Sequence, residues 1–171
     1  AICSDGGITV DLTDGSFKVR SEVLLDSSIA EKAVRMLRHE AQREDLAVMC
    51  MTGGSSQFKV VANADGFNAE ELTDKAMIND GRRLEMTSLA GVSEAAFTRD
   101  VRSVSLFGRF DALDPIADSL RKVLSRCSIT CYRETRDGGD LGWIDVQHMQ
   151  VNKFYAIAAL LGPEEAELSY M

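Results

Sequence analysis

The sequence of 171 residues has little proline, little tryptophan and few cysteines, with two, one and four of these residues. Four cysteines spread between Cys3 and Cys131 are too few and too scattered for a disulfide scaffold, so we expect reduced thiols and a cytoplasmic protein. Basic residues are also scarce: 19 Lys and Arg stand against 27 Asp and Glu, a net charge of −8. Nucleic acids and anionic membranes attract basic surfaces, so neither is an expected partner.

Long apolar runs are absent as well. No stretch approaches the roughly 20 residues that a membrane-spanning helix needs, and the first five residues lack the basic and then apolar order of a signal peptide. The hydrophobic content of 45% is that of a folded protein. The length suits one domain, or two small ones that share a core.

Recognisable catalytic and metal-binding motifs are missing too. Cys127, Cys131 and His148 supply three possible ligands, but zinc usually takes four and structural zinc sites favour closely spaced cysteines on a turn. Both cysteines lie among isoleucine and valine, which favours small buried side chains. Neither His39 nor His148 has an evident nucleophile or orienting carboxylate. We therefore predict no catalytic residue, no metal site and no cofactor.

The sequence does contain two similar runs of elements. Matching positions keep a nearly constant offset: Ile29 and Ile116 are 87 residues apart, and Gly53 and Gly138 are 85 apart. The first run is a strand at 21–25, a helix at 29–44, strands at 46–52 and 57–63, and a helix at 68–78. The second is a strand at 101–107, a helix at 115–124, strands at 127–133 and 142–148, and a helix at 152–161. A repeated β-α-β-β-α order is therefore predicted.

These two runs define the predicted domains. Residues 1–80 form the first unit, preceded by a hairpin of strands 8–12 and 17–19 about Asp14-Gly15. Residues 81–101 form a connector with a short strand at 84–86, and residues 102–171 form the second unit. The predicted fold class is α+β, with two ferredoxin-like βαββα repeats, antiparallel sheets and helices packed on one face.

Local signals place the helix boundaries. Ser28, followed three residues later by Glu31, forms a capping box that predicts the start of the first long helix. Asp114 followed by Pro115 is typical of a cap and a first helical residue. Gly162 after the last apolar position ends the final helix.

Strands 127–133 and 142–148 alternate clearly enough to predict their pairing. A loop near 135–140 sets Cys131 opposite Ile144 and Cys127 opposite His148. One face then holds only apolar side chains and Cys, and should lie under the helices. The other face carries Tyr132, Trp143 and several polar residues, and we predict that it is an interface with another sheet, subunit or ligand.

The repeated order resembles the ACT family of small-molecule-binding regulatory domains. Val104–Gly108 resembles the first ACT strand with its glycine, and Asp114-Pro115 resembles the turn into the first helix. Residues 166–170 would be the fourth strand. The resemblance covers roughly residues 17–80 and 102–170 and implies an arrangement like the paired units of aspartate kinases.

The resemblance also implies a ligand site at the loop between the first strand and first helix of each unit. In the second unit this loop holds Gly108, Asp111 and Asp114, and in the first unit Asp26 and Ser27. Backbone groups and the helix N-terminus would bind a carboxylate, and an aspartate would bind an ammonium group. Asp114 also suits a simple capping role.

Three functions remain open from the sequence. The first is a non-catalytic regulatory module that senses a metabolite, such as an amino acid, and acts through self-association. The second is an adaptor or chaperone-like module that binds another protein and no small ligand. The third is an enzyme with an unrecognised site, whose sign would be two perturbed ionisable groups in a pocket, such as Asp145 beside Arg133.

Overall fold

The computed structural model describes residues 2–3, 7–12, 18–44, 46–53, 59–63, 83–98, 100–133 and 140–161. Its strands form two sheets. A three-stranded antiparallel sheet has the order β1-β2-β3, with β1 (Ile2–Cys3), β2 (Ile8–Asp11) and β3 (Lys18–Glu22). A six-stranded sheet has the order β6-β5-β4-β7-β9-β8. Its strands are β4 (Ala47–Thr52), β5 (Lys59–Asn63), β6 (Arg83–Thr87), β7 (Val101–Arg109), β8 (Cys127–Arg133) and β9 (Leu141–His148).

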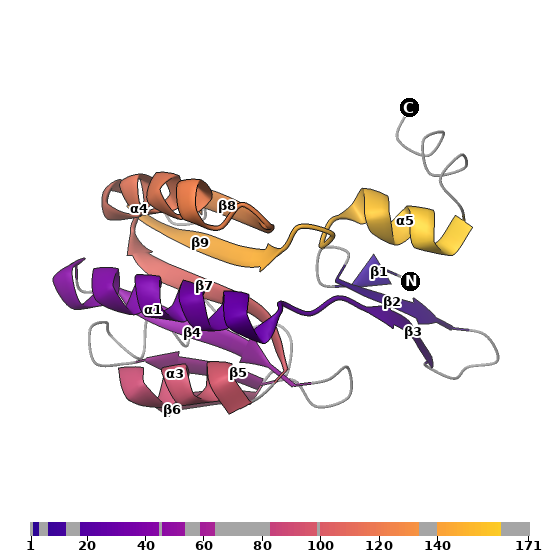
Figure 1. The fold of residues 1–171 in the computed structure, drawn as a ribbon, viewed down its shortest axis with the longest axis horizontal. Coiled ribbons are helices and arrows are strands. Elements are labelled where there is room, and N and C mark those ends of the chain that lie inside the picture. Colours follow the sequence, from indigo (N-terminus) through magenta and orange to yellow (C-terminus); the bar gives the residue numbers. More distant parts are fainter. Residues whose placement is uncertain are drawn as a thin grey trace.

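Three helices cover one face of the six-stranded sheet (Figure 1). They are α1 (Ser27–Glu44), α3 (Leu89–Thr98) and α4 (Phe110–Val123), and α1 lies between the other two. A further helix, α5 (Lys153–Leu161), packs beside β1 and β2 of the small sheet. No helix among the described residues is long and apolar enough to cross a membrane.

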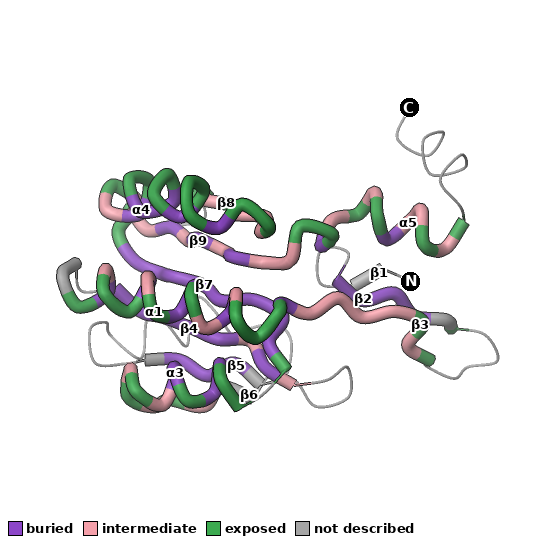
Figure 2. The backbone as a smooth tube through the Cα atoms, in the orientation of Figure 1, coloured by how far each residue is buried: buried purple, intermediate pink, exposed green. Residues whose placement is uncertain are grey.

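The main core lies between these helices and the six-stranded sheet (Figure 2). Helix α1 contributes a stripe of residues spaced three or four apart, as expected for a helix on a sheet: Ala30, Ala33, Val34, Leu37 and Ala41. Strand β7 is central, and its first eight residues are buried. Because β7 leads directly into α4, the end of this strand places the start of that helix beside α1.

The two sheets are joined at the start of β7. Leu25 pairs with Val101 in an isolated bridge, and the buried guanidinium of Arg102 forms an ion pair with Glu22 of β3. Arg102 Nε also donates to the carbonyl of Gly53, 3.2 Å away. Gly53 has a φ of 94°, which an L side chain adopts only with strain. This glycine lets the chain leave β4 with its carbonyl directed at Arg102.

The predicted pairing of β8 with β9 is confirmed. Cys131 lies opposite Ile144 and Cys127 opposite His148. Ile144 and Val146 are fully buried in the core, with the inward-facing residues of β8 packed against it. The predicted hairpin of β2 and β3 is also confirmed, and residues 84–86 lie in β6 as expected.

The predicted fold class is wrong. Strands from both expected units lie in one six-stranded sheet, because β4 pairs with β7 across the expected boundary. This sheet is mixed, since β5 and β6 run parallel. The expected connector contributes β6 and all of α3, whose Val92, Ala95 and Ala96 are buried. The boundaries at residues 80 and 101 stay a prediction.

Two helix starts also differ from the prediction. Helix α1 begins at Ser27, and the Asp26 carbonyl accepts the amides of Ile29 and Ala30, so Ser28 is already inside the helix. Helix α4 begins at Phe110, which places Pro115 inside it. The earlier start buries Leu113 completely, which offsets the hydrogen bond that the proline cannot donate. The predicted helix 68–78, residues 135–139 of the predicted loop and the strand 166–170 lie outside the described residues.

Candidate functional site

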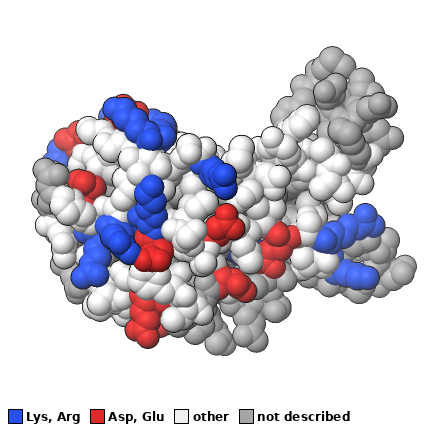
Figure 3. All heavy atoms as spheres, viewed as in Figure 1, with Lys and Arg blue, Asp and Glu red and all other residues white. Residues whose placement is uncertain are grey.

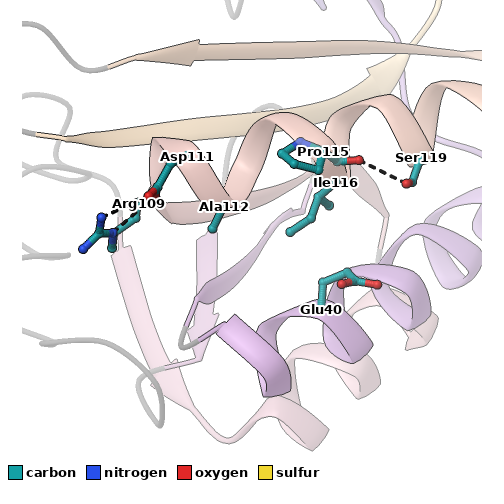
Figure 4. A pocket seen from close by; sticks show the side chains of 7 residues that line it. All are labelled: Glu40, Arg109, Asp111, Ala112, Pro115, Ile116 and Ser119. Carbon is teal, nitrogen blue, oxygen red and sulfur yellow. Dashed lines mark hydrogen bonds and ion pairs between the residues drawn. The ribbon is translucent and has the colours of Figure 1, made fainter.

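A cavity of about 530 Å³ lies between the C-terminal half of α1 and the first turns of α4 (Figure 4). Its lining comes from the end of β7 and from both helices: Glu40, Arg109, Asp111, Ala112, Pro115, Ile116 and Ser119. A neighbouring cavity of about 260 Å³ continues along α1, where Arg35, Met36, His39 and Leu120 join three residues of the first. The two cavities therefore form a groove between helices, with an apolar floor and charged edges.

The charged end of this groove is a bidentate ion pair. Arg109 Nε and its terminal nitrogen donate to the two oxygens of Asp111 at 3.2 and 3.0 Å. A carboxylate oxygen of Asp140 lies 3.6 Å from the same guanidinium. The hydrogen bond from Arg109 holds the pKa of Asp111 below its ordinary value, and the pKa of Arg109 is raised in return. Both side chains are well exposed, so solvent screens the pair.

The wider helix face carries charges of both signs, with Lys and Arg spread among Asp and Glu in the view of Figure 3. Several of these charges pair within their own helix: Glu31 with Arg35 on α1, and Asp118 with Arg121 on α4. Such exposed pairs contribute little to stability and give the face no strong field of one sign. Among the residues that the structure describes, the charges on this side therefore favour neither anions nor cations.

The residues predicted as a ligand site lie at two ends of the molecule. Asp111 lines the cavity, and Gly108 is buried in β7 just before it. Asp114 is an exposed residue of α4 outside the cavity lining. Asp26 and Ser27 lie at the opposite end of β7, beside its first residue, at a distance of about 25 Å along the strand. The two predicted loops are therefore not brought together.

A second candidate lies on the opposite side of the six-stranded sheet, where the side chains of β7, β8 and β9 point away from the helices. We call the residues Ser105, Tyr132, Trp143 and Asp145 the polar cluster. Ser105 Oγ donates to one carboxylate oxygen of Asp145 at 2.5 Å, and the Tyr132 hydroxyl donates to the other at 3.2 Å. Phe107 packs against Trp143, with 4.3 Å between ring centroids. The cluster combines a fixed carboxylate with an aromatic surface.

Arg133, expected beside Asp145, lies on the other face of the sheet. Alternation along β8 sets Arg133 on the helix side, where its guanidinium lies 4.6 Å from the centre of the Phe110 ring. It is also 3.7 Å from Asp140. The expected pair of perturbed groups is thus replaced by a contact that fixes the start of α4 against the end of β8.

The cysteines of β8 face the core. Burial raises the pKa of both thiols, and the negative charges of Asp26 and Asp114 raise those of Cys127 and Cys131 respectively. Raised values keep the thiols protonated and poorly nucleophilic at neutral pH. Across the described ranges, no three His, Cys, Asp or Glu side chains are grouped as a metal site would require.

Sequence reasoning missed several residues of both candidate sites. Arg109 and Glu40 entered no motif, because they meet only when β7 and α1 pack together. Ser105 left a readable signal: it alternates with Leu106 and Val104 along β7, which predicts a polar residue on the face away from the core. Its position opposite Asp145 needed the pairing of β7 with β9.

Comparison with known proteins then identifies the fold. No protein-family model and no curated protein matches the chain. A haloacid dehalogenase-like hydrolase from B. subtilis matches 94% of the chain with a TM-score of 0.63 and 12% identity. Another, from Bacteroides thetaiotaomicron, matches 94% with a TM-score of 0.58 and 15% identity. The chain has a haloacid dehalogenase-like fold. It matches 57% and 52% of those two chains, about half of their length.

A third match is described as a sugar phosphatase of haloacid dehalogenase subclass IIB. It covers 84% of this chain and 46% of its own length, with a TM-score of 0.52 and 10% identity. These matches overturn the resemblance to the ACT family, because the matching solved structures share a haloacid dehalogenase-like fold. The prediction of a tandem, non-catalytic regulatory module rested on that resemblance and is wrong with it.

Proposed function

We propose that this chain contributes to a phosphate-ester hydrolase of the haloacid dehalogenase type, acting on a small hydroxylated compound such as a sugar phosphate. One observation carries the proposal: 94% of the chain superimposes on about half of a haloacid dehalogenase-like hydrolase, and a sugar phosphatase is among the similar structures. The chain spans about half of these proteins. Its contribution to the proposed activity is therefore inferred from its own residues.

The six-stranded sheet is proposed to supply a surface that faces the substrate. The polar cluster supports this role, since a carboxylate held by two hydroxyl donors is fixed in direction before any ligand arrives. The groove between α1 and α4 supports it less well, because the charge of Arg109 there is already balanced by the carboxylate of Asp111, which accepts two of its hydrogen bonds. We therefore assign substrate contact to the sheet face and no reacting group to the groove.

The test is an assay of the 171-residue chain with a set of phosphorylated compounds. Release of inorganic phosphate is measured with divalent metal ions present, since phosphatases commonly use them, and ligand binding is measured by calorimetry on the same samples. We expect turnover or saturable binding of sugar phosphates, and no response to the matching free sugars. Absence of both turnover and binding across the whole set would overturn the proposal.

Association and location belong to the same proposal. The sheet face that holds Tyr132 and Trp143 was predicted as an interface, and contact with a second copy or another protein through it stays a prediction. A cytoplasmic location, expected from the small number of cysteines, also stays a prediction. Light scattering on the assay samples, with and without sugar phosphate, tests the first of these directly.

A further inference from the structure

We infer that this chain forms a two-fold dimer in which β8 of one copy pairs antiparallel with β8 of a second copy. The inference goes beyond the proposed function and does not depend on it. It starts from the order of the six-stranded sheet, in which β8 is the last strand. Among the described residues β8 pairs with β9 alone, so one row of its backbone groups points away from the sheet. A second strand of suitable sequence can pair with that row.

The sequence of β8 does little to prevent such pairing. Edge strands are normally protected by lysine, proline or a bulge. Strand β8 reads CSITCYR and contains neither lysine nor proline. Its register with β9 is continuous from Cys127 to Arg133, without a bulge. Arg133, at the very end, is its only charged residue, and the others are small, β-branched or aromatic. The strand therefore presents a regular edge.

The strand is also complementary to itself. Its middle residue is Thr130, so the register with the greatest overlap places Thr130 opposite Thr130 of the second copy. Ile129 then lies opposite Cys131, once on each side of the axis. Threonine pairs and apolar pairs are favourable across antiparallel strands. No two like charges oppose each other within the strand pair, because Arg133 lies opposite Cys127.

The other edge of the sheet does not share this property. Strand β6 has five residues, against seven in β8, and its middle residue is Glu85. Pairing of β6 with a second copy of itself would therefore set two glutamates opposite each other. Like charges directly opposite destabilise a strand pair. Of the two edges, β8 is the one that suits a second copy.

The helix above β8 gives a further match of charge. Helix α4 packs on β8 and is the outermost helix on that side of the sheet (Figure 1). Burial raises the pKa of the Cys131 thiol most, the charges of Asp114 and Asp118 raise it further, and that of Arg121 lowers it. These three helix residues are three or four positions apart, so they share the face of α4 above β8. A two-fold axis at the centre of β8 sets the two copies of α4 antiparallel, so that Asp114 of one copy faces the basic last turn, with Arg121 and Lys122, of the other.

The ends of the strand pair show a similar match. After burial, the charge of Asp26 is the next cause that raises the pKa of the Cys127 thiol, so Asp26 lies near that end of β8. Arg133 of the second copy would lie opposite Cys127 and bring its guanidinium towards that carboxylate. Both charged side chains are exposed, so they determine the register more than the affinity. Each match occurs twice and only in antiparallel pairing of β8 with itself, which favours a second copy over an unrelated strand.

The experiment measures association of the 171-residue chain by sedimentation velocity over a series of concentrations. Two variants replace Thr130, which is exposed, by lysine or by glutamate. The matched controls are Met86→Lys and Met86→Glu, which alter an exposed residue of β6, the other edge strand. Circular dichroism and thermal unfolding of all four variants check that the fold is kept.

We expect the unaltered chain to sediment as a dimer that dissociates on dilution. Thr130→Lys and Thr130→Glu should each raise the Kd of the dimer about tenfold or more, because like charges then meet on the axis. An equimolar mixture of these two variants should return to within about threefold of the unaltered chain, because a lysine then faces a glutamate. The two Met86 variants should stay within about twofold of it.

A cross-link tests the register and also serves if the charged variants fail to fold. Directly opposite residues of an antiparallel pair have Cα atoms about 4.5 to 5.5 Å apart, within the range of a disulfide. Thr130→Cys should therefore form a covalent dimer under mild oxidation. Ser128→Cys, two positions away on the same face, should not, because it lies opposite Tyr132. The unaltered chain, oxidised in parallel, measures the background from its own thiols.

Several results would overturn the inference. An unaltered chain that stays monomeric at every concentration up to its solubility limit would exclude the dimer. Equal weakening by the Thr130 and Met86 variants, or none by either, would place the contact elsewhere. A mixture of Thr130→Lys and Thr130→Glu that does not associate, or equal cross-linking of Thr130→Cys and Ser128→Cys, would contradict the two-fold register.

Discussion

Arg102 and Glu22 form an ion pair that joins the two sheets of this protein. Arg102 lies on β7 of the six-stranded sheet and its side chain is 6% exposed, while Glu22 ends β3 of the small sheet and is 22% exposed. The same guanidinium donates to the carbonyl of Gly53. The arginine is therefore solvated by two acceptors from different parts of the chain, which a buried charge requires.

We predict that Glu22→Ala lowers the free energy of unfolding by about 3 kcal/mol, because it removes a carboxylate that pairs with the buried guanidinium of Arg102. The matched control is Glu31→Ala. Glu31 also pairs with an arginine, Arg35, but both side chains of that pair are exposed on α1. Its removal should cost no more than about 0.5 kcal/mol. Urea denaturation of both variants measures the difference. Equal losses in free energy of unfolding would show that the buried ion pair between the sheets contributes no more than the exposed pair on α1.

Local pairing was predictable where alternation was strong. Strands β8 and β9 place apolar residues at every second position, so a shift of one residue would expose Ile144 and Val146. The register was therefore determined by burial of one face. The β2–β3 hairpin was predictable for a different reason. Two short strands that flank a turn are neighbours along the chain and pair readily.

Long-range pairing was not predictable in the same way. β4 lies beside β7, and neither sequence specifies the other strand as its partner, since both strands are buried on two faces and suit many neighbours. The offset of 85 to 87 residues between similar elements suggested two separate sheets. Helix α3 was missed because its Gly and Ser, in Leu89–Thr98, resemble a connector, although Ala95 and Ala96 pack in the core.

In the candidate sites, too, local contacts were predictable from the sequence and long-range contacts were not. Tyr132 and Trp143 were placed on the correct face of the hairpin from alternation alone. Their neighbour Ser105 was not, because its contact with Asp145 crosses 40 positions of sequence. Asp111 was selected for its place after a strand, and the arginine that binds it, Arg109, stands two residues earlier and attracted no notice.

Two buried threonines are expected to have opposite effects on stability when each is replaced by valine. Within the described part of the chain, Thr52 Oγ1 is a buried side-chain oxygen without a hydrogen-bond partner. Thr9 is buried to a similar degree, but its Oγ1 lies 2.6 Å from Ser21 Oγ. Replacing an unsatisfied buried hydroxyl by a methyl group removes a desolvation penalty, whereas replacing a satisfied one breaks a bond.

Thr52→Val is therefore expected to raise the free energy of unfolding by about 1 kcal/mol, and Thr9→Val to lower it by about 1 kcal/mol. Thermal and urea unfolding of the two variants provide the measurement. The substitution is chemically identical at both sites, so each variant is the control for the other. Destabilisation by the same amount at both positions would contradict the argument.

The ion pair at the start of α4 predicts how the carboxyl group of Asp111 titrates. The hydrogen bond from Arg109 lowers the pKa of Asp111 in the folded chain. A carboxyl group with a depressed folded pKa stabilises the fold above its unfolded pKa, and this contribution disappears as the pH falls through the folded pKa. NMR titration of the Asp111 carboxyl carbon should give a pKa below the ordinary value for aspartate.

In Arg109→Met the same titration should return towards the ordinary value, because the largest cause of the shift is removed. The side chains are exposed, so the accompanying change in stability between neutral and acid pH should be small and should decrease further in high salt. A pKa of Asp111 that does not change in Arg109→Met would show that the helix terminus, and not the arginine, lowers it.

Gly108 was selected from the sequence as part of a ligand loop, and its surroundings predict a packing role that can be tested. A Cβ atom at this position would overlap with Cδ2 of Leu46, a side chain that is itself buried. Gly108→Ala should therefore lower the free energy of unfolding by about 1 to 3 kcal/mol through overpacking. Leu46→Ala alone should cost about 2 to 5 kcal/mol by leaving a cavity. The double variant should cost less than the sum of the two, because the new methyl group occupies part of that cavity. Additive losses in urea denaturation would instead show that Gly108 is required by its backbone and not by its neighbour.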